Sequence, residues 1–320
     1  MDRPDSVGRL RTAVSNFAKE WLPGADRWCV ALSGGPDSLA LTAAAASLLP
    51  TTALIVDHGL QDGSAAVAQR ARDQAIALGC VEAQVLSVEV GGDGGPEAAA
   101  RTARYAALAQ ARDGAPVLIG HTLDDQAETV LLGLGRGSGP RSIAGIRPYD
   151  PPWCRPLLGV RREVTEAACD ALGLQAWRDP HNNDARYTRS RLRHEVLPLL
   201  EDVLGGGVAQ ALARTATALQ EDGDVLDELT TRAAALVVTE EGLDAVKLAR
   251  LPAAVRLRAI REWLLAGGAR NLTSRHIRGV DALVTAWRGQ GGVAIATEFT
   301  DRRVFAERRD GRLVLRHTPR

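Results

Sequence analysis

The first half of the chain alternates short apolar runs with segments of helical period, and this alternation constrains the fold most. The apolar runs, which we expect to be strands, are 28–32, 53–56, 85–90 and 117–120. The helical segments between them are 39–48, 65–78 and 97–112. Apolar strands joined by helices are typical of βαβ units, in which helices cover both faces of a parallel sheet. The sequence therefore predicts an α/β fold with ligands at the carboxyl ends of its strands.

A second, smaller domain is expected after a glycine run at 205–207, which we interpret as a hinge between residues 1–204 and 205–320. Before it the chain is irregular and proline-rich from 147 to 156, with further helices expected at 162–172 and 189–200. Beyond it, helical periods cover 208–221, 252–265 and 273–287. The final stretch resembles a hairpin that turns at Asp310 and Gly311. The second domain is thus predicted to be mainly helical, with a terminal hairpin.

Composition favours a cytoplasmic globular protein. The chain has 320 residues, 45% of them hydrophobic, and a formal net charge of zero. The charge is uneven, because residues 245–278 carry many basic and few acidic side chains. The four cysteines form no CxxC pair and no zinc-ligand spacing, which favours a reducing compartment. An apolar leader and a run approaching about 18 apolar residues are both missing, which argues against secretion and against membrane insertion.

The junction between the first strand and the following helix reads Ser33-Gly34-Gly35-Pro36-Asp37-Ser38. Two glycines allow a ligand to approach the backbone, the proline suits a first helical position, and free amides at a helix start favour phosphate. The motifs GxxxxGK[ST] and GxGxxG do not occur in the chain. A tight turn without a ligand would be the simplest interpretation. Asp37 argues against it, because a carboxylate beside bound phosphate needs a cation between them, such as Mg²⁺.

The segment GHTLDDQAETVLLGLGRGSGP follows the strand at 117–120 and contains a second group of polar residues. We expect a helix from about Leu123 that places Asp124 and Glu128 on one face and Asp125 on another. Asp125 has an alternative role, because Thr122 and Asp125 have the spacing of a capping box. That alternative leaves His121, the paired carboxylates and the run Arg136-Gly137-Ser138-Gly139 unexplained. The segment therefore adds a second group of candidate functional residues at the end of a parallel strand.

These motifs resemble those of a known family. SGGPDS matches the SGGxDS signature of the N-type ATP pyrophosphatases, or PP-loop enzymes. Within that group, the chain resembles the tRNA(Ile)-lysidine synthetase family over most of residues 28–200. The segments that carry this resemblance are PEAAARTARYAAL, GHTLDDQAETVLLGLGRGSGP, RPLL and RDPHNNDARYTRSRLRHEVLPLL. The chain differs from the family pattern at Thr122, His181 and Ser190, and it lacks the long third domain of some members.

The resemblance implies a Rossmann-like PP-loop domain and an ATP-dependent reaction on tRNA. In this reaction ATP adenylates the C2 carbonyl oxygen of the wobble cytidine in the CAU anticodon of tRNA(Ile) and releases pyrophosphate. Free L-lysine then attacks C2 through its ε-amine and expels AMP. The lysidine that forms pairs with A instead of G. The implied cofactors are ATP and Mg²⁺, and the oligomeric state is left open, a homodimer included.

The resemblance and the residues together give the expected site. Catalysis is assigned to Asp37, Asp125 and Arg104. Asp37 and Asp125, with Asp124 as an alternate, are the candidate metal ligands. ATP binding is assigned to Ser33, Gly34, Gly35, Pro36, Asp37 and Ser38, with Asp57, His58 and His121. Contacts to tRNA are assigned to Arg101, Arg104, Arg136, Arg186, Tyr187, Arg189, Arg191 and Arg193.

Several of these residues have ordinary structural alternatives. Asp57 follows a strand, where an Asp often serves only a turn. Glu97 and Arg101 have the spacing of an exposed ion pair on a helix. The arginines around Tyr187 resemble an ordinary solvated helix start.

Three other functions stay open from the residues. A PP-loop tRNA thiolase would deliver sulfur to a base and would need paired cysteines, which the sequence lacks. A non-catalytic ATP-binding protein would not need the acidic residues beside the phosphate loop. A general RNA-binding module would leave the loop at 33–38 unexplained.

Overall fold

The computed structural model describes residues 5–59, 63–89, 91, 96–137, 139–179 and 186–319. They form two compact units. The first comprises Met1–Leu132 and Gly145–Ala216, and the second comprises Gly133–Ala144 and Thr217–Arg320. The functional division expected after residue 204 stays a prediction.

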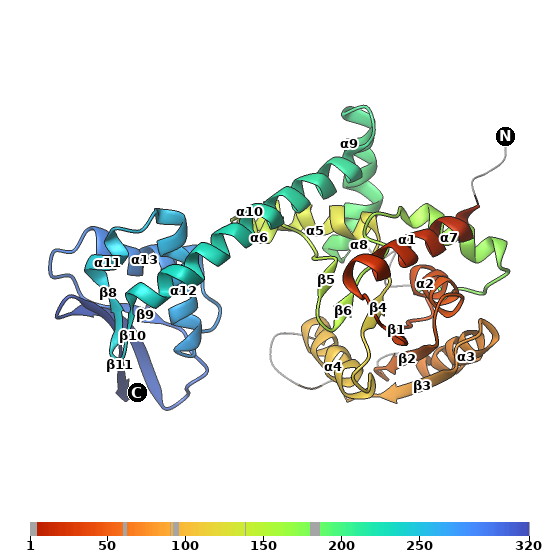
Figure 1. Ribbon diagram of the computed structural model, residues 1–320, viewed down its shortest axis with the longest axis horizontal. Helices are drawn as coiled ribbons and strands as arrows, with labels where there is room; N and C mark the ends of the chain where they lie inside the picture. The colour runs from red at the N-terminus through yellow and green to blue at the C-terminus, as the bar shows by residue number, and fades with distance from the viewer. Residues whose placement is uncertain are drawn as a thin grey trace. The chain divides into compact units, whose positions relative to one another are not determined.

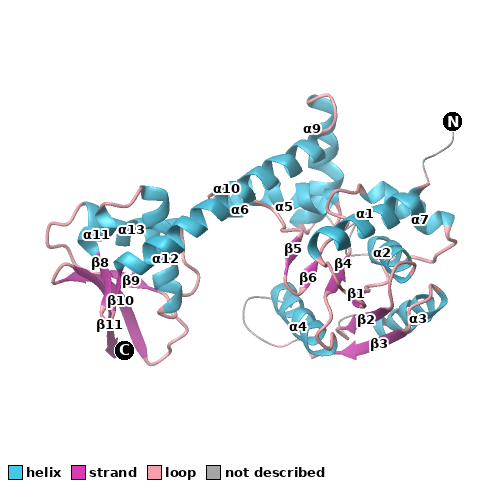
Figure 2. Cartoon of the chain, viewed as in Figure 1, coloured by secondary structure: helices cyan, strands magenta, loops and turns pink. Residues whose placement is uncertain are grey.

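A six-stranded sheet forms the centre of the first unit (Figures 1 and 2). Its strands are β1 (Trp28–Ala31), β2 (Thr51–Asp57), β3 (Glu82–Ser87), β4 (Val117–Ile119), β5 (Tyr149–Asp150) and β6 (Trp153–Cys154). The order is β3-β2-β1-β4-β6-β5, and only β5 pairs antiparallel with its neighbour. The predicted parallel α/β fold is confirmed.

Helices cover both faces of this sheet. Val30 packs into a core with α1 (Ser6–Trp21), α2 (Pro36–Ala46), α3 (Ser64–Ala77) and α7 (Arg162–Ala171). The neighbouring Cys29 points to the other face and packs with Leu108 of α4 (Pro96–Ala111). Successive residues of a strand face opposite sides, so a strand covered on both faces must be apolar throughout. This explains the continuous apolar runs in the sequence.

The order of the strands brings two loops together. The chain runs from β1 outward through β2 and β3, then returns to place β4 on the other side of β1. This reversal is a topological switch point, where α/β proteins bind ligands. The loops that follow β1 and β4 both begin at this point. They contain or lead into the two polar groups of the sequence, residues 33–38 and 121–125. Helix α5 (Leu123–Arg136) begins directly after the second loop.

The helical segment expected at 189–200 contains a π-helical turn. It consists of α8 (Thr188–Arg191), a π segment (Leu192–Val196) and α9 (Leu197–Val203). Pro198 lies just after the π segment, and proline cannot donate the backbone hydrogen bond that a regular α-helix needs. The three glycines at 205–207 all have positive φ, and they separate α9 from α10 (Val208–Val237).

The second unit contains a five-stranded antiparallel sheet in the order β7-β8-β11-β10-β9. Its strands are β7 (Val238–Thr239), β8 (Gly242–Asp244), β9 (Val293–Ile295), β10 (Arg302–Arg309) and β11 (Arg312–Pro319). Its helices are α6 (Pro140–Ile143), α11 (Ala245–Ala249), α12 (Ala253–Ala266) and α13 (Ser274–Thr285), with part of α10. The expected hairpin is confirmed, because β10 and β11 pair around Asp310 and Gly311, both at positive φ.

Several expectations need correction. Helix α1 was not expected, although Leu10, Val14 and Phe17 recur at helical spacing and are buried. Helix α10 extends to Val237, well beyond the expected end at 221, because its helical period continues past the polar stretch around Gly223. Helix α13 has the expected Thr273 cap, but it ends before Trp287. The second unit also contains the strands β7, β8 and β9, in addition to the two strands of the terminal hairpin.

Within the described residues, no single helix is both long and apolar enough to cross a membrane. One bent pair, formed by residues 188–203 and 208–237, passes that test by length and composition only.

Two glycines of α5 allow a test of helix packing. A Cβ at Gly133 would lie 2.0 Å from the backbone oxygen of Ser142, whereas a Cβ at Gly135 would meet nothing within 4 Å. We expect Gly133→Ala to lower the free energy of unfolding by roughly 1–3 kcal/mol, because α6 must move. The matched Gly135→Ala should raise it by up to about 1 kcal/mol, because alanine favours helix. Urea unfolding of both variants measures this, and equal effects would contradict the packing shown here.

Candidate active site

The loop after β1 is closed by its own two serines. The Ser33 amide and hydroxyl lie 3.2 and 3.1 Å from the Ser38 hydroxyl, and the Ser38 hydroxyl donates to the carbonyl of Gly35 at 2.9 Å. Gly34 adopts a φ of +80°, which side chains rarely tolerate. Pro36 then begins α2. The loop is therefore a fixed turn that leads directly into the amide-bearing end of a helix.

Gly120 permits the two loops to approach. A Cβ at this position would lie 3.0 Å from the backbone oxygen of Asp37, at the start of α2. The end of β4 thus packs against the first turn of that helix with no room for a side chain. The two polar groups of the sequence are for this reason neighbours in the fold.

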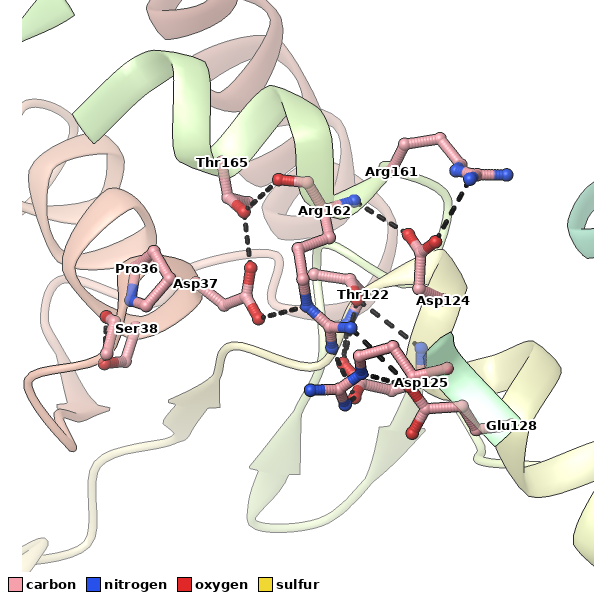
Figure 3. Close-up of polar contacts among 12 residues, drawn as sticks. Pro36, Asp37, Ser38, Thr122, Asp124, Asp125, Glu128, Arg161, Arg162 and Thr165 are labelled. Carbon is pink, nitrogen blue, oxygen red and sulfur yellow. Dashed lines mark hydrogen bonds and ion pairs between the residues drawn. The ribbon is translucent and has the colours of Figure 1, made fainter. Parts of the chain in front are cut away.

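One guanidinium joins acidic residues near the starts of α2 and α5 (Figure 3). Arg162 Nε donates to Asp37 Oδ2 at 3.0 Å, and its Nη2 donates to Asp125 Oδ1 at 2.8 Å. Its Nη1 lies 3.5 Å from Glu128 Oε1. These three carboxylates come from α2 and α5, whereas Arg162 begins α7. The Arg162 side chain is 15% exposed, so this network is largely shielded from solvent.

Asp37 is held by two side chains. Besides Arg162, the hydroxyl of Thr165 donates to its Oδ1. Burial raises the pKa of Asp37 from its ordinary value, and the nearby Arg162 and Thr165 only partly offset this effect. Asp37 is therefore desolvated, and its contacts with Arg162 and Thr165 recover only part of that cost.

Asp125 forms the expected capping box. Its Oδ2 accepts from the amide and the hydroxyl of Thr122, both at 2.8 Å, and its own amide lies 3.5 Å from that hydroxyl. Burial raises the pKa of this carboxyl, but Arg162, His121 and the Thr122 hydrogen bonds together hold it below the usual range. Asp125 therefore caps the first turn of α5 and also faces Asp37 across the shared guanidinium.

Glu128 joins the same network. The sequence placed it on a face with Asp124, but its side chain lies with Asp125, because both contact Arg162. It is fully buried, and its Oε1 accepts from Arg193 Nε at 2.7 Å. Its Oε2 is buried and has no hydrogen-bond partner among the described residues. Arg193, expected to contact tRNA, lies in the π segment and here holds a buried carboxylate.

Asp124 faces a different group. Its Oδ2 accepts from the backbone amide of Arg162 at 2.8 Å, and its Oδ1 lies 3.2 Å from Arg161. The proposed metal ligands Asp37, Asp124 and Asp125 are therefore not gathered around one point. Among the described residues, no group of three or more His, Cys, Asp or Glu side chains is arranged to hold a metal ion. As they stand, these residues do not fit a divalent cation, because a guanidinium lies between Asp37 and Asp125.

The basic face of α4 is packed around an aromatic ring. The guanidinium carbons of Arg101 and Arg104 lie 5.0 and 5.4 Å from the ring centre of Tyr105, and Trp153 contacts that ring edge to face at 4.7 Å. Burial lowers the pKa of Arg104. The side chain of Glu97 lies outside the described residues. Arg101 and Arg104 are thus oriented by Tyr105, as a preformed cationic surface would require.

His58 follows β2, and His121 lies two residues after the end of β4. Burial lowers the pKa of both, to about 4 for His121, and the positive charge of Arg104 lowers both further. Their Nδ1 atoms are buried and have no hydrogen-bond partner within the described part of the chain. Asp57, by contrast, accepts from the amide of Gly59 at 3.0 Å. It therefore stabilises the turn after β2, which is the structural alternative given for it in the sequence.

The remaining tRNA candidates lie on helix ends. Arg136 ends α5, in the second unit, and Arg191 pairs with Glu195 one turn on. Arg186, Tyr187 and Arg189 are exposed at the start of α8. Ser138 and His181 lie outside the described residues. The tRNA roles of these residues stay predictions.

Arg162 and Thr165 were missed by sequence reasoning. A signal existed, since Arg161 and Arg162 stand at the start of a helix, where the positive end of the helix dipole disfavours cations. Arginines in that position need nearby carboxylates, which here come from Asp37 and the start of α5.

The fold and the site are those of a PP-loop protein. Residues 8–200 match the family model described as the PP-loop domain, and residues 243–314 match the TilS substrate binding domain. The first match covers more than half of the chain. A PP-loop domain implies use of ATP, which agrees with the phosphate loop expected at 33–38.

The relatives identify the family further. The tRNA(Ile)-lysidine synthase of Mycolicibacterium paratuberculosis is 69% identical over 100% of this chain and 99% of its own length. Those of Mycobacterium tuberculosis H37Rv and Mycobacterium leprae are 68% and 65% identical, with full coverage of both chains. The chain belongs to the tRNA(Ile)-lysidine synthase family, so the resemblance seen in its motifs is confirmed.

A solved structure shares the fold. The U34-tRNA thiolase NcsA from Methanococcus maripaludis, solved with its [4Fe-4S] cluster, aligns with a TM-score of 0.55 at 18% identity. The alignment covers 68% of this chain and 80% of that chain.

The low pKa of His121 predicts a pH dependence of stability. Because the native pKa is about 4 and the ordinary value is 6.5, the unfolded chain takes up a proton that the native protein does not. The stability contributed by neutral His121 is present above about pH 6.5 and is lost as the pH falls towards 4. The loss is at most about 3 kcal/mol.

The measurement is urea unfolding at several pH values between 4.5 and 7.5. His121→Asn should lose less stability on acidification than the wild type. His194→Asn, which replaces an exposed histidine, is the matched control and should follow the wild type. Parallel curves for the wild type and His121→Asn would contradict the assignment.

Proposed function

We propose that this protein ligates lysine to C2 of the wobble cytidine in the CAU anticodon of tRNA(Ile). The C2 carbonyl oxygen attacks the α-phosphorus of ATP, and pyrophosphate leaves. The ε-amine of lysine then attacks C2 and loses a proton. The bond from C2 to the adenylated oxygen breaks, and AMP leaves with that oxygen. The product is lysidine, which changes the codon read by the tRNA from AUG to AUA.

The observation that carries this proposal is the meeting of two loops at the switch point. The phosphate loop 33–38 and the Thr122–Asp125 capping box lie together there, in a chain 69% identical over its full length to a tRNA(Ile)-lysidine synthase. The amides of the loop and of the first turn of α2 can hold the β- and γ-phosphates as pyrophosphate departs. Such preorganised donors stabilise a developing anion without further rearrangement.

The cationic residues support a role on the RNA and the adenylate. Arg104 and Arg101 are stacked on Tyr105, and we assign them to the adenylate or to a tRNA phosphate. Exposed Arg186, Tyr187, Arg189 and Arg191 suit contact with phosphate and stacking on a splayed base. His58 and His121 are assigned to the nucleotide site, because each has a buried nitrogen available for a hydrogen bond.

Magnesium belongs to this proposal as part of the substrate Mg·ATP. Asp37 and Asp125 are the carboxylates assigned to it, with Asp124 as alternate. With Arg162 between Asp37 and Asp125, these carboxylates do not form a site for the ion, and no step is assigned to it.

The other proposed partner is free L-lysine. A homodimer is the assembly to be tested. We assign the protein to the cytosol, because its four cysteines are free and buried, as is usual in a reducing compartment. The same cysteines disfavour the thiolase alternative. They are spread over β1, the turn before β3, β6 and α7, and sulfur transfer would need a reactive pair.

The decisive experiment measures pyrophosphate release and incorporation of labelled lysine with the purified protein, Mg·ATP and tRNA(Ile) carrying a CAU anticodon. Release that requires the tRNA, together with fixed lysine, supports the proposal. Release without incorporated lysine would show an adenylating enzyme with another nucleophile. No release would favour a non-catalytic ATP-binding protein.

Asp37→Asn tests the loop itself. The amide keeps the size of the side chain but removes the negative charge that we assign to the Mg²⁺ of Mg·ATP, so we expect tRNA-dependent pyrophosphate release to fall by about 100-fold or more. Asp26→Asn is the matched control, because Asp26 is exposed before β1. If both variants released pyrophosphate at the wild-type rate, the loop would have been assigned wrongly.

A further inference from the structure

We propose that Arg162 is a positioning residue that occupies the place of a divalent cation between Asp37 and Asp125, and that Mg·ATP can engage these carboxylates only when the guanidinium withdraws. The inference rests on the proposed function for its nucleotide. It concerns the protein before the nucleotide binds.

Arg162 occupies the space between the two carboxylates. Arg162 donates to one oxygen of each carboxylate, Asp37 Oδ2 at 3.0 Å and Asp125 Oδ1 at 2.8 Å. The other two oxygens accept from Thr165 and Thr122. Magnesium binds carboxylate oxygens at about 2.1 Å in a near-octahedral shell, so it cannot share the space that the guanidinium fills. The ion and Arg162 are therefore alternatives.

The surroundings of Arg162 are acidic and largely buried. Asp37, Asp125 and Glu128 are three acidic groups with 20%, 12% and 0% side-chain exposure. Carboxylates this close disfavour one another's charge unless a cation lies between them. Arg193 contacts Glu128 and lies 3.6 Å from Asp125. Among the described residues, Arg162 is the only cationic side chain within 4.0 Å of Asp37. Without bound metal, it is this residue that holds the loop carboxylate and α5 together.

Glu128 offers the guanidinium of Arg162 an alternative hydrogen-bond partner. The backbone of Arg162 is fixed, because its amide donates to Asp124 and it begins α7. Its side chain can rotate about that anchor. Glu128 Oε1 already lies 3.5 Å from Nη1, and Glu128 Oε2 is buried without a partner among the described residues. A shift of the guanidinium from Asp37 towards Glu128 would satisfy that oxygen and free the two carboxylates.

The test uses Mn²⁺ alone with the nucleotide-free protein, and the free ion is measured by its electron paramagnetic resonance signal. In Arg162→Gln the carboxylates lose their internal cation, so the dissociation constant of Mn²⁺ should fall by about tenfold or more. Arg162→Lys keeps a positive charge and should bind Mn²⁺ as weakly as the wild type. Arg256→Gln is the matched control, because Arg256 forms a similarly buried ion pair with Asp281 in the second unit and contacts none of these carboxylates.

Arg162→Gln that folds, as judged by circular dichroism, yet binds Mn²⁺ no more tightly than the wild type would overturn the proposal. A purely structural role for Arg162 would lower stability without raising the affinity for Mn²⁺. The two roles are therefore distinguished by this readout.

A second measurement uses the wild-type protein and does not depend on the folding of a variant. In a ¹⁵N-arginine spectrum, the Nε–H signal of Arg162, assigned by its loss in Arg162→Lys, should be protected from exchange by Asp37. Addition of Mg²⁺ with the α,β-methylene analogue of ATP should shift this signal and remove the protection. A signal that stays unchanged while other signals report binding would overturn the proposal.

The two experiments distinguish an incorrect role of Arg162 from an incorrect proposed function. Tighter Mn²⁺ binding by Arg162→Gln with no lysine incorporation by the wild type would contradict the proposed function alone. Normal lysine incorporation with no change in Mn²⁺ affinity would contradict the role of Arg162 alone.

Discussion

The contact of one guanidinium with three carboxylates organises the site. Asp37 lies on α2, and Asp125 and Glu128 lie on α5, so their mutual repulsion would separate the two helices. Arg162 brings a third helix, α7, into the same network. Burial strengthens such charge-assisted hydrogen bonds and makes an unpaired partner costly. The relative placement of the phosphate loop and of the helix after β4 therefore depends on a residue outside both motifs.

Much of the fold follows from local rules that the sequence displays. The apolar runs at β1 and β2 are continuous because the sheet is covered on both faces, and together with the helical segments between the runs they identify a parallel α/β domain. Gly34 at positive φ and the hairpin at Asp310 and Gly311 reflect backbone geometry that these residues prefer. Family motifs then supplied the class of reaction. These features could be predicted because each depends on only a few consecutive residues.

The features that sequence reasoning missed depend on distant contacts. Arg162 meets Asp37 across 125 positions and Asp125 across 37, and no periodicity records such a pair. The length of α10 was underestimated because helix propensity weakens near Gly223, although Thr230, Ala233 and Val237 beyond it are buried. The acidic residues were assigned to a metal for a similar reason. A sequence shows that carboxylates need a cation, but it does not show whether the cation is a bound ion or an arginine.

The same distinction applies to the basic region at 245–278. Ion pairs already hold several of its cations, namely Lys247 with Asp244, Arg256 with Asp281, Arg258 with Asp227 and Arg270 with Glu298. The Arg256 pair is nearly buried, so it serves the fold, whereas the exposed Arg270 pair is weak and can exchange its carboxylate for a phosphate. Exposed Arg250, Arg275 and Arg278 add to the surface charge. Affinity for RNA depends on the cations that can release counterions, so this region is less positive towards a tRNA than its composition implies.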